Sequence, residues 1–148
     1  MFLYTGHIAC AEVIDEKSFD GNFLARNVLT RSDPEDQGNF WATQNYSQDY
    51  FILDLGWVLL RRLVQLVNTH SAGWRDKSTK EIKVFLKTSL NEPWQEVVHE
   101  MLADSRQEED PLPLLTFEFS PRLGRYVKVQ VEDWYGVGGG LQYFNIIG

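Results

Sequence analysis

The chain has 148 residues, of which 43% are hydrophobic and 24% are charged, and this composition indicates one folded globular domain spanning residues 1–148 rather than a disordered chain. Its net charge of -7 opposes binding to nucleic acid and to anionic membrane surfaces, so we expect no nucleic-acid partner and disfavour membrane lipid. The single cysteine, Cys10, cannot form an internal disulfide, and we expect it to be a small buried thiol.

Alternation of apolar and polar residues predicts strands along most of the chain. The residues 58–67 also fit a helical stripe, but we interpret them as a strand because residues 54–56 read as a turn and strands surround them. About eight strands predict an all-β fold, an antiparallel β-sandwich or jelly roll, with Trp41 and Trp94 in its core. In chain order the predicted strands are residues 7–14, 50–56, 58–67, 80–88, 94–101, 114–120, 125–133 and 141–147.

The loop around residues 68–78 has the residue types that a sugar site needs. An aromatic ring can cover the apolar side of a pyranose, and planar polar groups can bind paired hydroxyls. The alternative is that the tryptophan of this loop covers the end of the sandwich and that its neighbours form a surface ion pair of little energetic value. The candidate ligand-binding residues of this loop are His70, Trp74, Arg75, Asp76 and Lys77.

A second candidate loop joins Trp134 and Tyr135 to the glycine-rich run 136–140. Glycines allow a ligand or another segment of backbone to approach closely. We interpret Trp134 as a plug for the end of the sandwich, and Tyr135 as the better candidate for ligand binding.

The segment "SDPEDQGN", residues 32–39, gathers oxygen-bearing side chains on one turn. Calcium prefers six to eight oxygen ligands, so Asp33, Asp36 and Asn39 are candidate calcium ligands, and a solvated acidic turn is the alternative. Asn45 begins an N-glycosylation triplet, but the sequence does not decide whether it is used.

Three segments together resemble the coagulation factor V/VIII type C (discoidin) domains: "FWATQNYSQDYFILDLG", "RDKSTKEIKVFLKTSLNEPWQEV" and "GRYVKVQVEDWYGVGGGLQYFNIIG". The resemblance covers roughly residues 27–148. It implies a galactose-binding-like jelly roll of about eight strands that binds glycans, phospholipid headgroups, collagen or other proteins through loops at one end. Such domains are usually extracellular and often belong to larger chains.

The sequence departs from this family at several points. It lacks the disulfide that ties the termini of many members, and its candidate loops lack the apolar spikes of the phospholipid-binding members. Many sugar-binding members hold calcium with an early acidic loop and a glutamate in the last strand, but residues 141–147 contain no glutamate. The spacing of His, Arg and Arg–Gly–Asp in fucose-binding members is also missing.

No catalytic signature appears in the chain. It has no HExxH zinc motif, no G-x-S-x-G nucleophile elbow and no phosphate-binding loop followed by a helix. We therefore predict a non-catalytic module. The resemblance, together with the composition of the loop around residues 68–78, implies that it recognises a glycan or glycoprotein and that it is extracellular or at the cell surface as part of a larger chain. The alternative is a protein-interaction module with no sugar ligand, which would also suit the cytoplasm.

Overall fold

The computed structural model describes residue 8, residues 10–29 and residues 40–148, and in them the fold is all-β and antiparallel, as predicted. Two short 3-10 helices, Ala25–Val28 and Ala72–Trp74, are the helical elements of this part. The strands are β1 (Glu12–Glu16), β2 (Trp41–Ala42), β3 (Tyr50–Asn68), β4 (Lys77–Lys87), β5 (Gln95–Met101), β6 (Leu115–Gly136) and β7 (Gly140–Ile147). Among the described residues no helix is long and apolar enough to cross a membrane.

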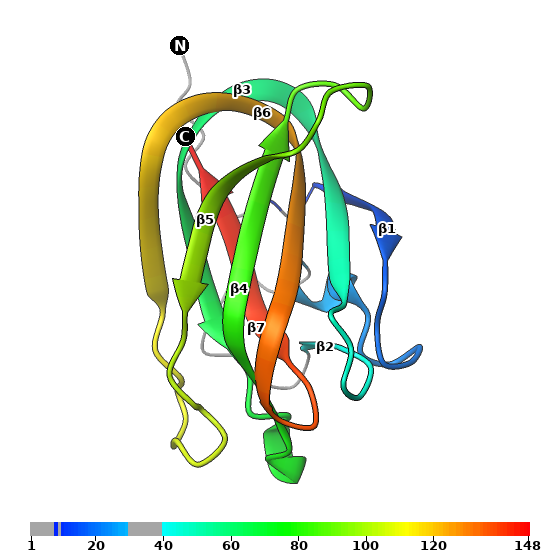
Figure 1. Cartoon of the computed structure of the whole chain (residues 1–148), viewed down its shortest axis with the longest axis vertical. Coiled ribbons are helices and arrows are strands. Elements are labelled where there is room, and N and C mark those ends of the chain that lie inside the picture. Colours follow the sequence, from blue (N-terminus) through cyan, green and yellow to red (C-terminus); the bar gives the residue numbers. More distant parts are fainter. Residues whose placement is uncertain (1–7, 9, 30–39) are drawn as a thin grey trace.

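The strands β3 and β6 are long, bent and shared by both layers of the sandwich, and together they arch over the top of Figure 1. The first part of β3 pairs with β1 and with the second part of β6, which continues to β4 and β5. The second part of β3 lies between β7 and the first part of β6, and β2 extends this layer beyond β7.

This bend changes the expected strand count. Residues 50–56 and 58–67 form one strand rather than two, as do residues 114–120 and 125–133, and the predicted turn at residues 54–56 is wrong. The pairing of β3 with β6 shifts register between Asp54 and Leu59 and then resumes, so the two strands turn the corner together. The interpretation of residues 58–67 as a strand is confirmed.

The core lies between the two layers and takes its side chains from alternate positions of the strands, as the period of two requires. Trp41 is fully buried, as predicted, and its indole N–H donates to the Ser18 hydroxyl at 3.0 Å. The main buried side chains are Trp41, Phe51, Leu53, Val64, Leu66, Ile82, Val84, Leu86, Val127, Val129, Val131, Leu141, Phe144 and Ile146.

Two predictions about buried residues are wrong. Trp94 is half-buried before β5, with the Lys87 ammonium 4.2 Å from its ring centroid, so it is a surface cation–π partner rather than a core residue. Cys10 is exposed, because β1 begins at Glu12 and Cys10 lies in the preceding turn.

Replacing Phe51 by alanine tests the aromatic centre of the core. The Phe51 ring lies 4.9 Å from Trp41 and 5.9 Å from Phe144, both edge-on. Deleting a buried phenylalanine side chain costs about 3–5 kcal/mol, so we expect Phe51→Ala to lower the melting temperature by on the order of 10 °C. The exposed Trp57 is the control, and Trp57→Ala should change the free energy of unfolding by no more than about 0.5 kcal/mol. Equal melting temperatures for the two variants would contradict this assignment of the core.

Candidate functional site

A pocket of about 400 Å³ opens at the end of the sandwich that carries the helix Ala72–Trp74, at the bottom of Figure 1. It is formed where the chain before the helix Ala25–Val28 meets β2, the turn before β3 and the loop between β3 and β4. Its volume lies in the range of small-ligand sites. The residues that line it are Phe19, Asp20, Asn22, Phe23, Phe40, Ala42, Asn45, Ser71, Trp74, Asp76 and Lys77.

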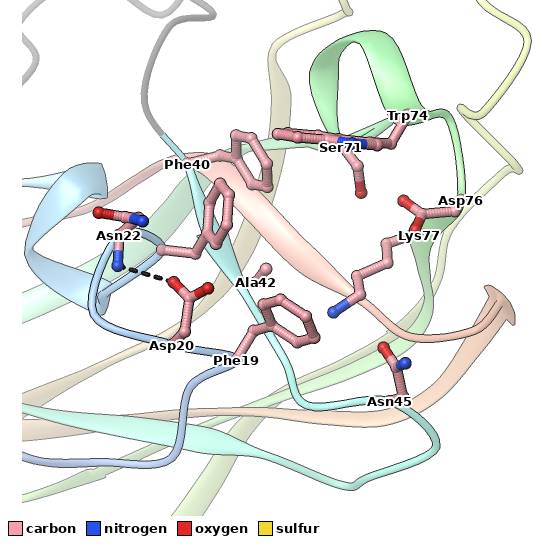
Figure 2. Close-up of a pocket in the computed structure, with 11 residues that line it drawn as sticks. Phe19, Asp20, Asn22, Phe40, Ala42, Asn45, Ser71, Trp74, Asp76 and Lys77 are labelled. Atoms are coloured by element: carbon pink, nitrogen blue, oxygen red, sulfur yellow. Dashed lines mark hydrogen bonds between the residues drawn. The ribbon is translucent and has the colours of Figure 1, made fainter.

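Aromatic rings form a continuous wall of the pocket. The Phe23 ring lies 4.9 Å from Phe40 and 5.8 Å from Trp74, the latter at 87°, and Phe19 lies 6.0 Å from Phe23. Trp74 and Phe19 are exposed, and Figure 2 shows them on opposite sides of the opening. Exposed rings held in place by other rings offer a rigid apolar surface to a ligand.

Lys77, the first residue of β4, brings a buried cation into this pocket. Its side chain is 4% exposed, and its ammonium lies 3.9 Å from the centroid of the Phe19 ring and donates to the Thr43 carbonyl at 2.5 Å. Among the described residues it forms no salt bridge. Burial lowers the pKa of Lys77 below its ordinary value, and the nearby carboxylates of Asp76, Asp49 and Asp20 act in the opposite direction.

Further polar groups face the same space. The Ser71 side chain is buried, and its hydroxyl has no hydrogen-bond partner among the described residues. Figure 2 shows the side chains of Asp76, Lys77 and Asn45 together on one side of the opening, with Asp20 on the other. Asp20 accepts a hydrogen bond from the Asn22 backbone N–H at 2.7 Å and keeps its second oxygen for another donor. The pocket therefore combines donors and acceptors with an aromatic wall.

The sequence-predicted residues of this loop divide between the pocket and its support. Trp74, Asp76 and Lys77 line the pocket together. His70 is buried and pairs through Nε2 with Asp110 at 2.7 Å. The Arg75 guanidinium donates to the carbonyls of Arg106 and Glu108, at 2.8 and 3.1 Å. Both side chains thus fix the loop to the segment before β6, outside the pocket lining.

Tyr135 also lies outside the pocket lining. Its hydroxyl donates to the Leu102 carbonyl at 2.9 Å. Trp134 packs against the core. The glycines beside them allow close packing: a Cβ on Gly140 would collide with the Trp41 carbonyl, and one on Gly136, where φ is 72°, with the Asp76 carbonyl. That same Asp76 carbonyl accepts the Val137 N–H at 2.9 Å, so the β6–β7 turn fixes the backbone of a pocket residue.

The predicted calcium ligands, Asp33, Asp36 and Asn39, lie outside the described residues. Within residues 8, 10–29 and 40–148, no group of three His, Cys, Asp or Glu side chains is arranged to hold a metal ion.

Sequence reasoning missed more than half of the pocket. All of the missed residues except Ser71 come from segments outside the β3–β4 loop, and only folding brings them beside it. Ser71 lies in that loop, but its residue type alone did not mark it as a site residue. One signal was present in "SFDGNF", residues 18–23. It places two phenylalanines among polar loop residues, outside any alternating pattern that would direct them into the core. The missed lining residues are Phe19, Asp20, Asn22, Phe23, Phe40, Ala42, Asn45 and Ser71.

Comparison with known proteins identifies the fold. No protein-family model matches the chain, and no curated protein matches it either. Among solved structures, the family 32 carbohydrate-binding module of Clostridium perfringens NanJ, in complex with galactose, has a TM-score of 0.76 at 11% identity, covering 97% of this chain and 98% of that one. A second module of the same type, from a C. perfringens family 31 glycoside hydrolase, has a TM-score of 0.76 at 13% identity, with coverage of 98% and 95%.

Chitosan-binding module 1 of a Paenibacillus sp. IK-5 chitosanase/glucanase has a TM-score of 0.70 at 14% identity, covering 96% of this chain and 98% of that one. The chain therefore has the galactose-binding-like β-sandwich fold.

The pH dependence of folding tests the burial of Lys77. Because its pKa in the folded protein is lowered, the unfolded chain binds this proton more tightly. The free energy of unfolding of the wild type should therefore rise, relative to that of Lys77→Met, as the pH increases from the lowered pKa toward the ordinary value of 10.5.

Urea unfolding at neutral pH and at a series of alkaline pH values measures this difference. Lys128→Met is the matched control, since the Lys128 ammonium also lies over aromatic rings but outside the pocket, and this variant should keep the rise. If the free energies of unfolding of the wild type and Lys77→Met change in parallel with pH, folding does not lower the pKa of Lys77. That result would contradict the interpretation that burial destabilises its charged form.

Proposed function

We propose that this chain is a non-catalytic carbohydrate-binding module whose ligand site is the pocket beside Trp74. The observation that carries the proposal is that one opening combines an exposed aromatic wall, a buried ammonium and a buried hydroxyl that has no partner among the described residues. A sugar ring has an apolar face and a rim of hydroxyls, so it needs both kinds of surface within the width of one ring.

The pocket can meet these needs with residues of known position. The Trp74 ring would cover the apolar face of the sugar, and Asp20 and Asp76 would accept hydrogen bonds from hydroxyl groups. Lys77 would donate to a hydroxyl oxygen through N–H bonds that Thr43 does not use. Affinity for a single sugar should be modest, because few contacts form and each polar group must first lose its water.

The ligands of similar folds support this proposal. The NanJ module was solved with galactose, another C. perfringens module with GalNAc-β-1,3-galactose, and chitosan-binding module 2 of the Paenibacillus protein with chitotriose. We extend the proposal to a discoidin-type module that acts outside the cell or at its surface as part of a larger chain, with a glycan or glycoprotein as its partner.

The tryptophan pair Trp74 and Trp57 allows a matched test of the site. Their exposed fractions are 66% and 74%, but Trp57 lies in the middle of β3, where the pairing with β6 shifts register, and it is not part of the pocket lining. We expect Trp74→Ala to weaken binding to the best sugar of a glycan panel by about tenfold or more, roughly the loss of 1.4 kcal/mol. Trp57→Ala should bind as the wild type does.

Glycan-array screening followed by titration calorimetry gives the measurement, and thermal melts confirm that both variants fold. If the folded wild type binds no glycan of a broad panel, the carbohydrate proposal is wrong. If Trp57→Ala loses sugar binding and Trp74→Ala does not, the site lies at the other end of the sandwich.

One observation favours the protein-interaction alternative. Trp57, Leu59, Leu60 and Leu123 are all exposed at the β3–β6 corner, and neighbouring exposed apolar side chains often mark a protein contact. Under this alternative, Trp57→Ala should abolish binding to a protein partner. Sugars should bind neither to this corner nor to the pocket beside Trp74.

We retain calcium as a further proposal. Calcium would bind oxygen ligands, and Asp33, Asp36 and Asn39 are the candidates from the sequence.

A ligand that binds only the folded state raises the melting temperature by mass action, so calcium should raise that of the wild type and have less effect on Asp36→Ala. Magnesium serves as the control cation. Equal melting temperatures in calcium and in chelator would end this proposal.

A further inference from the structure

The charges in the pocket disfavour a charged sugar. The Lys77 ammonium faces the carboxylates of Asp76 and Asp20, which line the same opening, and the carboxylate of the buried Asp49 also acts on it. Asp49 is itself engaged by the Gln44 backbone N–H at 2.6 Å and by the Ser47 hydroxyl. A sugar carboxylate would meet Asp20 and Asp76, and a sugar ammonium would meet Lys77, so either charge faces a like charge. An uncharged ligand avoids both costs.

Two donors in the pocket call for a strong acceptor on the ligand. The Lys77 ammonium has three N–H bonds, and among the described residues Thr43 accepts one of them. The Ser71 side chain is 2% exposed, its hydroxyl has no partner among the described residues, and Figure 2 shows it directed into the space above Lys77. A buried hydroxyl without a partner costs free energy unless the ligand supplies that partner. An amide carbonyl accepts two hydrogen bonds and carries no net charge.

The apolar lining is larger than one face of a sugar ring requires. Trp74 alone offers a platform for that face. Figure 2 shows Phe19 on the opposite side of the opening and the methyl group of Ala42 between the two sides. The Lys77 ammonium lies over the Phe19 ring, so an acceptor bound to Lys77 is held beside this second apolar surface. A group that joins a carbonyl to a methyl fits both neighbours at once.

We infer that the sugar recognised by this pocket carries an acetamido group, bound with its carbonyl oxygen at Lys77 and Ser71 and its methyl group against Phe19 and Ala42. The inference rests on the proposed function and adds the chemical class of the sugar. The amide N–H can donate to one of the two pocket carboxylates, Asp20 or Asp76, so every polar atom of the group finds a partner. A hydroxyl in the same place would leave the second apolar surface uncovered.

A series of sugars that differ at one position tests this inference. The probes are the methyl glycosides of glucose, glucosamine and N-acetylglucosamine, the matching galactose series, and the methyl glycoside of glucuronic acid as the acidic probe. Two-dimensional NMR titration measures the weak affinities expected for single sugars. In at least one series, the acetamido sugar should bind about tenfold more tightly than its hydroxyl counterpart, because it gains hydrogen bonds to an ammonium and a hydroxyl. The ammonium and carboxylate sugars should bind more weakly than the acetamido sugar.

Variants locate the preference. Lys77→Met and Ser71→Ala should each reduce the preference for the acetamido sugar, by about tenfold and about threefold, while Trp74→Ala should weaken all sugars alike. Lys128→Met is the control and should keep the preference. Ser71→Ala removes a buried hydroxyl that has no partner among the described residues, so loss of folding is not expected to obscure its effect.

The possible failures are distinguishable. Equal affinity for hydroxyl and acetamido sugars, or tightest binding of the carboxylate or ammonium sugar, overturns the acetamido inference and leaves carbohydrate binding intact. If no probe shifts the resonances of the pocket residues and a broad glycan panel is also negative, the proposed function fails and this inference fails with it.

Discussion

The side-chain amide of Asn68 is the interaction on which the geometry of the pocket depends. Its oxygen accepts the backbone N–H groups of Thr69 and Thr79, at 2.8 and 3.0 Å, and its nitrogen donates to the Thr79 carbonyl and the Ser78 hydroxyl, at 2.9 and 3.2 Å. The amide thus takes the place of a strand residue opposite Thr79 and ties the end of β3 to the start of β4. All of these groups are buried, so a missing bond would leave an expensive unpaired partner.

This clamp allows the loop between β3 and β4 to hold an unfavourable backbone. Ser71, Ala72 and Arg75 have φ values of 61°, 51° and 52°, a left-handed conformation that costs non-glycine residues roughly 1 kcal/mol or more each. The contacts of His70 with Asp110 and of Arg75 with the carbonyls of Arg106 and Glu108 hold the loop from its other side. The strain is concentrated where the chain turns Trp74 outward and Ser71 inward, and both residues line the pocket.

The sequence predicted what depends on local pattern and missed what depends on distant contacts. Alternation at Val127, Val129 and Val131 identified the buried face of β6, because strand geometry alone sends every second side chain to one layer. The same pattern cannot show that β3 and β6 turn a corner without a loop, since that depends on their register with each other.

The site follows the same division. Trp74, Asp76 and Lys77, which line the pocket, were predicted as ligand-binding residues because they lie in one loop whose composition suits a sugar. Phe19 and Ala42 were missed because the pocket joins them to that loop across the fold. Arg75 was assigned to the ligand by residue type, but type does not reveal that two backbone carbonyls occupy its guanidinium.

Lys77 shows why stability alone does not explain the pocket. Methylene and methyl groups would fill its volume without the cost of burying a charge, and its N–H groups have one acceptor in the described part of the protein. The Phe19 ring and the surrounding carboxylates make that charge tolerable, and they do so without occupying all of its hydrogen bonds. An ammonium that is held rigidly, partly desolvated and incompletely satisfied loses little further hydration when a ligand acceptor reaches it. The same features that make Lys77 costly to the empty protein therefore suit it to bind an uncharged, oxygen-bearing group.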